Sequence, residues 1–128
     1  MTDTLLDQAR AAQQRAYAPY SRFHVGCAIE AEDGRVFVGC NVENASYGLT
    51  ICAERAAVCA AVAAGARAFR RAVVVSDADP PAAPCGACRQ VLSEFGRELE
   101  VDGVGPSGAV HWTIGELLPA AFGKEQLT

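Results

Sequence analysis

Three cysteines in two short motifs set the strongest constraint on how this chain folds. Cys52 opens the segment Cys52-Ala53-Glu54-Arg55, and 33 residues later Cys85 opens Cys85-Gly86-Ala87-Cys88. Each motif lies at the start of a predicted helix, where the partial positive charge of the helix N-terminus favours deprotonated thiols. If the three thiolates share one ion, two helix N-termini must meet at one point of the fold.

The hydrophobic pattern predicts an α/β fold. Apolar residues alternate over 23–29 and 36–40 on either side of Asp33-Gly34, which indicates an antiparallel hairpin, and further strands are expected at 73–75, 99–104 and 109–113. Helices are expected over about 4–16, 51–64 with Thr50 as its N-cap, 85–95, and a short stretch that begins with a Thr113–Glu116 capping box. We therefore predict three α/β/α layers around a mixed sheet of about five strands, in a single domain spanning 1–128.

Composition narrows the possible partners. The net charge is -4 and the basic residues are scattered, which disfavours a nucleic-acid ligand. The sequence has no apolar run near the roughly 18 residues that a membrane span needs, and the N-terminus lacks the apolar core of a signal peptide. We expect a cytoplasmic protein that acts on a small molecule and binds neither nucleic acid nor membrane.

The remaining cysteines and the alanine-rich helix are interpreted as packing features. Cys27, Cys40 and Cys59 lie among apolar neighbours, where free cysteine usually acts as a small buried hydrophobe. The predicted helix over 51–64 carries little charge, so we expect it to be buried on most sides within the domain, with a second subunit as a further candidate cover.

The residue types of the two motifs indicate a catalytic zinc centre. Cys52, Cys85 and Cys88 supply three thiolates, which leave a tetrahedral Zn²⁺ one open position where a bound water becomes a nucleophile near neutral pH. Glu54 is placed to shuttle a proton between that water and a substrate nitrogen. Arg55 is placed to draw charge from the thiolates, with a surface salt bridge as the alternative, and Arg89 is a weaker candidate for the same role.

Two other uses of the cysteines remain open. A purely structural zinc site would need a fourth protein ligand, for which Cys59, Cys40, His24 and His111 are the candidates, none at a convincing spacing. A Cys-x-x-Cys pair alone also suits a redox motif, but Cys52 and Glu54 favour the metal.

Several segments resemble the small homotetrameric zinc-dependent cytidine deaminases over essentially the whole length. They are Cys52 to Arg55, Pro19-Tyr20-Ser21-Arg22-Phe23, Gly39-Cys40-Asn41-Val42-Glu43-Asn44-Ala45, Pro84 to Gln90, and Leu117-Leu118-Pro119-Ala120-Ala121-Phe122-Gly123. Zinc deaminases of this kind pair a catalytic glutamate with a Pro-Cys-x-x-Cys element. The resemblance implies a cytidine deaminase-like fold and one Zn²⁺ per subunit. It also implies hydrolytic release of ammonia from cytidine and 2'-deoxycytidine in pyrimidine salvage.

The same resemblance implies the substrate contacts. Asn41 and Glu43 would bind the ribose hydroxyls, Phe23 would pack against the nucleoside, and the backbone around Ala53, together with Glu54, would read the base. Phe122 would enter a neighbour's active site in a homotetramer with shared sites. From the residues alone, Asn41 and Glu43 at the end of the strand are more often part of a turn, and a late aromatic such as Phe122 usually packs on its own domain.

Three rival functions follow from the same residues. A related enzyme could deaminate another cytosine-bearing compound, such as blasticidin S, with the same zinc elements. Deamination of nucleic acid is disfavoured by the absence of a basic channel. A zinc-stabilised binding module without catalysis would hold the metal but convert nothing.

Overall fold

The described part of the chain, residues 4–127 of a computed structural model, is organised around one five-stranded sheet. The strands are β1 (Gly26–Ala31), β2 (Val36–Cys40), β3 (Phe69–Val75), β4 (Glu100–Val104) and β5 (Ala109–Thr113), in the spatial order β2-β1-β3-β4-β5. The β3–β4 pair is parallel and the other three pairs are antiparallel. The sheet is therefore mixed, as the pattern predicts.

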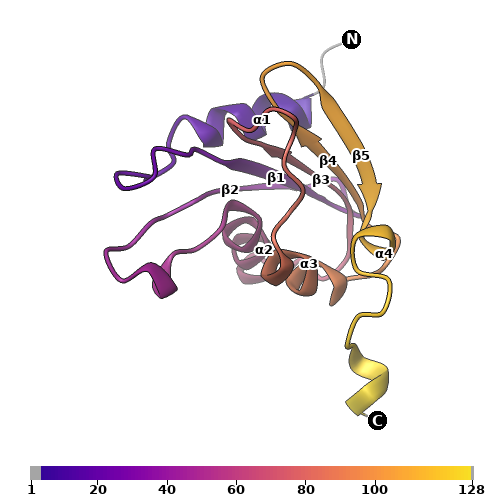
Figure 1. The fold of residues 1–128 in the computed structure, drawn as a ribbon. Coiled ribbons are helices and arrows are strands. Elements are labelled where there is room, and N and C mark those ends of the chain that lie inside the picture. The colour runs from indigo at the N-terminus through magenta and orange to yellow at the C-terminus, as the bar shows by residue number, and fades with distance from the viewer. Residues whose placement is uncertain (1–3, 128) are drawn as a thin grey trace.

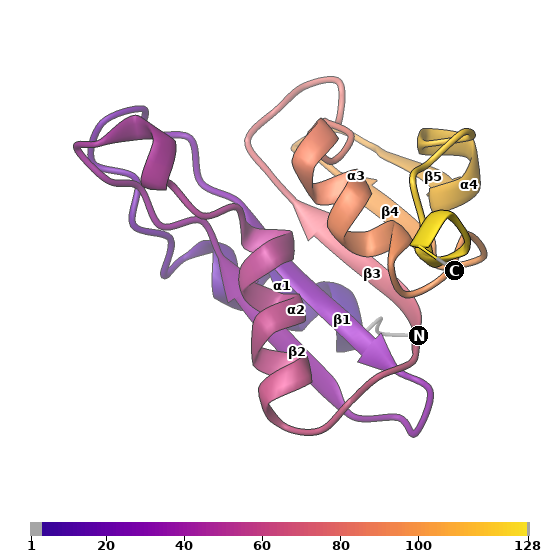
Figure 2. The same cartoon turned by 90° about the horizontal axis from the view of Figure 1, so that it is seen from below.

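Helices cover both faces of this sheet (Figure 1). α1 (Thr4–Gln13) lies on one face, and α2 (Ala53–Ala63) and α3 (Gly86–Ser93) lie on the other. Figure 2 shows α2 and α3 side by side over the sheet. α4 (Ile114–Leu117) begins at the predicted Thr113–Glu116 capping box, and two short 3-10 helices, η1 (Tyr47–Leu49) and η2 (Lys124–Leu127), complete the described residues. The predicted three-layer α/β/α architecture is confirmed.

Two apolar cores hold the layers together. The larger one lies between the sheet and the pair α2 and α3, and its fully buried members include Ile29, Leu92 and Ile114. The smaller one joins α1 to the opposite face through residues such as Leu5 and Val73. This division follows from the alternation of side chains along each strand, since consecutive residues face opposite layers. In the region that the structure describes, no helix has the length and apolar character that crossing a membrane requires.

Gly39 lets α2 approach β2 closely. A Cβ atom built at this position would lie 2.5 Å from the Ala53 carbonyl oxygen and 2.9 Å from the Ala56 Cβ. Any side chain would therefore push the first turn of α2 away from the sheet. Because Cys52 and Glu54 lie at that first turn, the glycine in β2 helps to position the predicted site.

Several predicted element boundaries are wrong. β3 begins at Phe69 rather than at residue 73, and α1 ends at Gln13 rather than near residue 16. Two further differences bear on the site. β1 begins at Gly26 rather than at residue 23, because the preceding residues are not part of the strand ladder. The N-cap of α2 is Cys52 rather than Thr50, since Ile51 forms an isolated bridge with Val42 before the helix starts. Both corrections lie beside the predicted site, where the chain leaves regular structure.

The packing role predicted for the other cysteines holds only in part. Cys27 is buried and Cys40 is half-buried, but Cys59 is exposed. Cys59 lies on the outer side of α2 together with Ala60, Ala63 and Ala64, which are also exposed. Within this chain α2 is therefore buried along one side only, and none of the six cysteines forms a disulfide.

Candidate metal centre and active site

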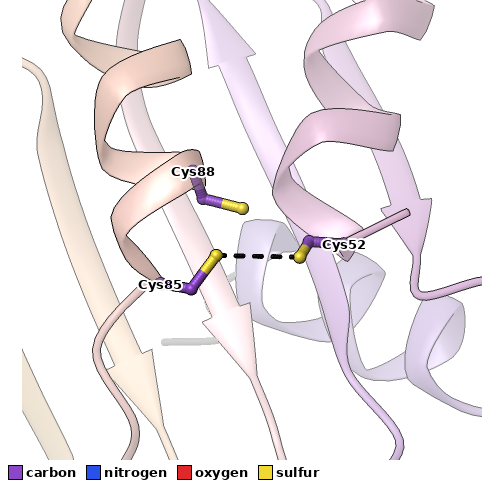
Figure 3. A group of neighbouring side chains, drawn as sticks. All are labelled: Cys52, Cys85 and Cys88. Carbon is purple, nitrogen blue, oxygen red and sulfur yellow. Dashed lines mark hydrogen bonds between the residues drawn. The ribbon is translucent and has the colours of Figure 1, made fainter. Parts of the chain in front are cut away.

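The three predicted ligands converge at the N-termini of two helices (Figure 3). Cys52 is the N-cap of α2, Cys85 is the N-cap of α3, and Cys88 lies in the first turn of α3. Their three Sγ atoms all lie within 4.8 Å of one another. Among the described residues this is the only cluster of histidine, cysteine or acidic side chains with the spacing of a metal site.

The sulfur geometry fits a tetrahedral zinc ion. Cys52 Sγ lies 3.8 Å from Cys85 Sγ, which is far too long for a disulfide bond. Two thiolates on a tetrahedral zinc are about 3.8 Å apart when each zinc–sulfur bond is about 2.3 Å. Three thiolates from two helix N-termini also form the soft donor set that zinc prefers.

The thiols differ in how easily they ionise. Hydrogen bonds from Cys88 foremost, and then from Arg55 and Cys85, together lower the pKa of Cys52 to about 5. The hydrogen bond with Cys52 raises the pKa of Cys88, and burial adds to that rise. Of these two thiols, Cys52 therefore carries negative charge more readily than Cys88.

Arg55 lies beside the thiolate that it was predicted to support. Its Nη2 donates to the carbonyl oxygen of Thr50 at 3.1 Å and lies 3.9 Å from Cys52 Sγ. The second predicted arginine has other partners, because Arg89 donates from Nε to the Pro84 carbonyl at 2.7 Å and from Nη1 to the Leu117 carbonyl at 3.0 Å. Arg89 thus connects the start of α3 to the end of α4.

Glu54 is a buried carboxyl in the wall of a cavity next to the thiols. The cavity has a volume of about 220 Å³ and is also lined by Cys52 and Cys85. Only 5% of Glu54 is exposed, and burial raises the pKa of its carboxyl to about 6. A buried carboxyl whose pKa is raised toward neutrality can both accept and return a proton.

Three of the predicted substrate contacts line the same cavity. They are Phe23, Asn41 and Ala53. The cavity lies at the carboxyl end of β3, where Val74 and Ser76 form part of the wall, and this end of a strand is the usual place for ligands in α/β sheets. The structure therefore brings Phe23, Asn41 and Ala53 together with Glu54, although they are dispersed in sequence.

Glu43 lies in a neighbouring hollow rather than in this cavity. Its Oε1 accepts hydrogen bonds from the backbone nitrogens of Tyr20 and Ser21 at 3.0 and 3.2 Å, and its Oε2 accepts one from the Ser21 hydroxyl. These bonds, the Ser21 hydroxyl foremost, lower the pKa of Glu43. Thr50 lines both the hollow and the cavity, so the two spaces are adjacent.

Phe122 does not line the cavity of its own chain. It is 58% exposed and lies in the C-terminal segment that runs away from the helices in Figure 1. Its carbonyl oxygen accepts a hydrogen bond from Gln90 Nε2 at 2.9 Å. The Phe122 ring is therefore not packed into the core of its own domain.

Sequence reasoning missed several residues of the cavity wall. Ser76 is a buried polar residue, and the signal that could have found it is its place directly after the apolar strand β3. Thr50 lines the cavity instead of capping α2. Ala82 and Ala83, just before Pro84, also line it, but small apolar residues in a loop carry no such signal.

Comparison with known proteins matches this site to one family. Residues 1–101 match the sequence profile described as the cytidine and deoxycytidylate deaminase zinc-binding region. A cytidine deaminase of Sporosarcina psychrophila is 44% identical, and the match covers 98% of this chain and 94% of the relative. A cytidine deaminase of Mycobacterium tuberculosis is 48% identical, with 96% and 90% of the two chains covered.

Solved structures agree with the sequence matches. A crystal structure of cytidine deaminase from Burkholderia pseudomallei superposes with a TM-score of 0.90 at 52% identity and covers 95% of this chain and 100% of the other. The cytidine deaminase structure from Mycobacterium tuberculosis gives a TM-score of 0.81 at 47% identity, with 94% and 95% covered. With its three-thiol cluster beside a buried glutamate, this chain belongs to the zinc-dependent cytidine and deoxycytidylate deaminase family of hydrolases.

Proposed function

We propose that this protein converts cytidine to uridine and 2'-deoxycytidine to 2'-deoxyuridine, with release of ammonia, as a step of pyrimidine salvage in the cytoplasm. One observation carries the proposal. The carboxyl of Glu54 is buried in a cavity whose wall also contains two of the three clustered thiols. Relatives that are 44–48% identical over nearly the whole chain are named cytidine deaminases.

In this proposal, Cys52, Cys85 and Cys88 hold one zinc ion per subunit. When bound, the zinc supplies an activated water at its open position. Glu54 accepts the proton of the attacking water and passes it to N3 of the pyrimidine, and it then helps to protonate the departing amine. Arg55 moderates the charge of the Cys52 thiolate from its place 3.9 Å away.

Substrate binding is assigned to the other residues of the cavity. The Phe23 ring packs against the nucleoside, and the backbone at Ala53 together with Glu54 reads the base edge. Asn41 meets the ribose from the cavity wall. Glu43 binds the ribose from the adjacent hollow, which the sugar reaches by extending past Thr50.

We further propose a homotetramer in which Phe122 completes the site of a neighbour. Support comes from the exposed Phe122 ring and from the uncovered outer side of α2 with Cys59, Ala60 and Ala63. The cavity of about 220 Å³ is also smaller than the roughly 300 Å³ at which ligand sites usually begin. In a homotetramer, a second copy would enclose space that is open to solvent in the single chain, and the complete site would then be larger. A sedimentation-equilibrium mass equal to that of one chain would contradict this part of the proposal.

The main test is conversion of cytidine, followed by ultraviolet absorbance, by the purified zinc-loaded protein. Glu54→Gln keeps the size of the side chain but removes its basic oxygen, so turnover should fall by about a hundredfold or more with zinc retained. Glu98→Gln, at an exposed position outside the cavity, serves as the matched control. Bound zinc without conversion of cytidine would instead identify a zinc-stabilised binding module.

The closest rival is deamination of another cytosine-bearing compound, such as blasticidin S, by the same zinc elements. Glu43 separates the two possibilities. If the substrate carries a ribose, Glu43→Ala should reduce kcat/KM for cytidine by about tenfold or more, because a hydrogen-bonded charge is lost. An unchanged kcat/KM would favour the rival substrate.

A further inference from the structure

Side chains hold much of the segment Phe23–Val25, which forms one wall of the cavity. The segment precedes β1, so few of its backbone groups form hydrogen bonds with a neighbouring strand. On the side toward β2, Asn41 Nδ2 donates to the Phe23 carbonyl at 2.8 Å and Asn41 Oδ1 accepts from the Val25 nitrogen at 2.9 Å. The backbone nitrogen of Asn41 also donates to the Val25 carbonyl at 3.2 Å. The Phe23 nitrogen donates to the Ser21 hydroxyl at 3.0 Å. The two remaining backbone groups of the segment belong to His24 and face the opposite side.

Asp77 and Gln13 satisfy those groups of His24. The His24 nitrogen donates to Asp77 Oδ2 at 2.8 Å, and Gln13 Nε2 donates to the His24 carbonyl at 3.1 Å. Gln13 Nε2 also lies 3.3 Å from Asp77 Oδ1, so the carboxylate and the amide are joined to each other. The His24 ring adds a further contact, with Nδ1 3.4 Å from Asp77 Oδ2. Together they replace the neighbouring strand that β1 has from Gly26 onward.

Gly26 brings Gln13 within reach of this segment. A Cβ atom built on Gly26 would overlap the Ala9 carbonyl oxygen and lie 2.9 Å from Gln13 Cα. Without a side chain at this position, the last turn of α1 can rest directly on the first residue of β1. The amide of Gln13 then reaches past the start of the strand to His24.

Asp77 also connects two walls of the cavity. It follows Ser76 at the end of β3 and begins the loop that carries Ala82 and Ala83 to Cys85. Through the His24 backbone, the same carboxylate holds the neighbour of Phe23 on the opposing wall. A shift of Asp77 would therefore change the distance between the Phe23 ring and the loop wall.

We propose that Asp77 is a positioning residue for substrate binding, which sets Phe23 against the nucleoside through His24 and Gln13. The inference rests on the substrate contact assigned to Phe23 in the proposed function. Asp77 touches neither the thiol cluster nor Glu54 in any hydrogen bond or ion pair found among the described residues. Its loss should therefore weaken substrate binding and leave the chemical step intact.

The test is a cycle of isosteric substitutions in the zinc-loaded protein. Asp77→Asn places an NH2 group against one of two donors, either the His24 nitrogen or Gln13 Nε2. KM for cytidine should rise about fivefold, a partial loss of a charge-assisted hydrogen bond at a half-exposed site, with kcat within about twofold. Gln13→Glu sets two carboxylates against each other and should raise KM similarly. In the double variant the new amide donates to the new carboxylate, although the donor to the His24 carbonyl stays lost. KM should therefore rise by less than the product of the two single effects.

Asp79→Asn is the matched control in the same loop. Within residues 4–127, Asp79 accepts a side-chain hydrogen bond from the Ser107 hydroxyl alone, and it lies outside the cavity wall. Hydrogen exchange over residues 21–26 gives a readout that does not depend on activity, and it should speed up in Asp77→Asn but not in Asp79→Asn. If the wild-type protein converts cytidine but Asp77→Asn leaves KM or this exchange unchanged, the inference is overturned. It is also overturned if kcat and zinc content fall together with binding. Failure of the wild-type protein to convert cytidine would instead overturn the proposed function.

Discussion

The sulfur atoms of Cys52 and Cys85 lie 3.8 Å apart, although the two residues belong to different helices. Each thiol is placed by the N-cap of its own helix, and the two helices rest side by side on one face of the sheet (Figure 2). A metal held there joins α2 to α3 directly. Zinc binding should therefore contribute to stability as well as to chemistry.

Cys85→Ala should lose most of the bound zinc. Two remaining thiols leave the site one ligand short, and the unfolding temperature should drop because the link between α2 and α3 is weakened. Elemental analysis and scanning calorimetry measure both effects. Cys59→Ala is the control, since that thiol is exposed on the outer side of α2. Equal zinc content in the two variants would contradict the assignment of Cys85.

Arg55→Gln should lower kcat for cytidine by about tenfold with zinc retained. The substitution removes the guanidinium that donates to Thr50 and lies beside the Cys52 sulfur, so more negative charge stays on the metal site. Arg55→Lys keeps the charge and should recover part of the activity, whereas Arg10→Gln at an exposed position on α1 should have no effect. Steady-state kinetics with parallel zinc analysis makes the comparison. A wild-type kcat in Arg55→Gln would refute this role.

Gly39→Ala should lower the free energy of unfolding by about 2 kcal/mol or more. The added methyl group would lie 2.5 Å from the Ala53 carbonyl, so α2 has to move away from β2. Gly48→Ala is the control, because a Cβ atom there meets nothing within 4 Å and should change stability by less than about 0.5 kcal/mol. Urea denaturation of both variants measures the difference. Similar losses in the two would mean that close helix–sheet contact is not the cause.

His111 should stabilise the protein more at low pH than at high pH. Its Nδ1 lies 2.6 Å from Asp102 and its Nε2 3.4 Å from Glu100, and the hydrogen bond with Asp102 foremost raises the pKa of the histidine. A raised pKa in the folded state means that this stabilisation is fully present below the unfolded-state pKa of about 6.5 and is lost as pH rises through the folded-state value.

The corresponding variant is His111→Gln. Because His111 is half exposed, its effect on the free energy of unfolding should be no more than about 0.5 kcal/mol at low pH, and it should vanish once the pH exceeds the raised folded-state pKa. Urea denaturation at two pH values measures it. In an Asp102→Asn background the pH dependence should largely disappear. A larger effect of His111→Gln at high pH would show that the sign is wrong.

Much of the fold could be predicted because its signals are local. The alternation over β2 and the capping box of α4 each depend on residues a few positions apart, and both predictions are confirmed. The start of β1 was predicted wrongly because the Phe23–Val25 segment has the alternation of a strand but is held partly by Asn41 and Asp77 side chains. No local pattern distinguishes an extended segment inside a ladder from one held in this way.

The sequence by itself determined the chemistry of the site. Cys52, Glu54, Cys85 and Cys88 are grouped in two short motifs at helix starts, so the donor set and the proposed acid–base group could be predicted before any fold was known. Tertiary structure alone decided how the cavity is walled. The contact between Gln13 and Asp77 spans 64 residues, and it exists only because α1 packs closely on β1. Contacts over such separations depend on the packing of whole elements, which residue spacing does not encode.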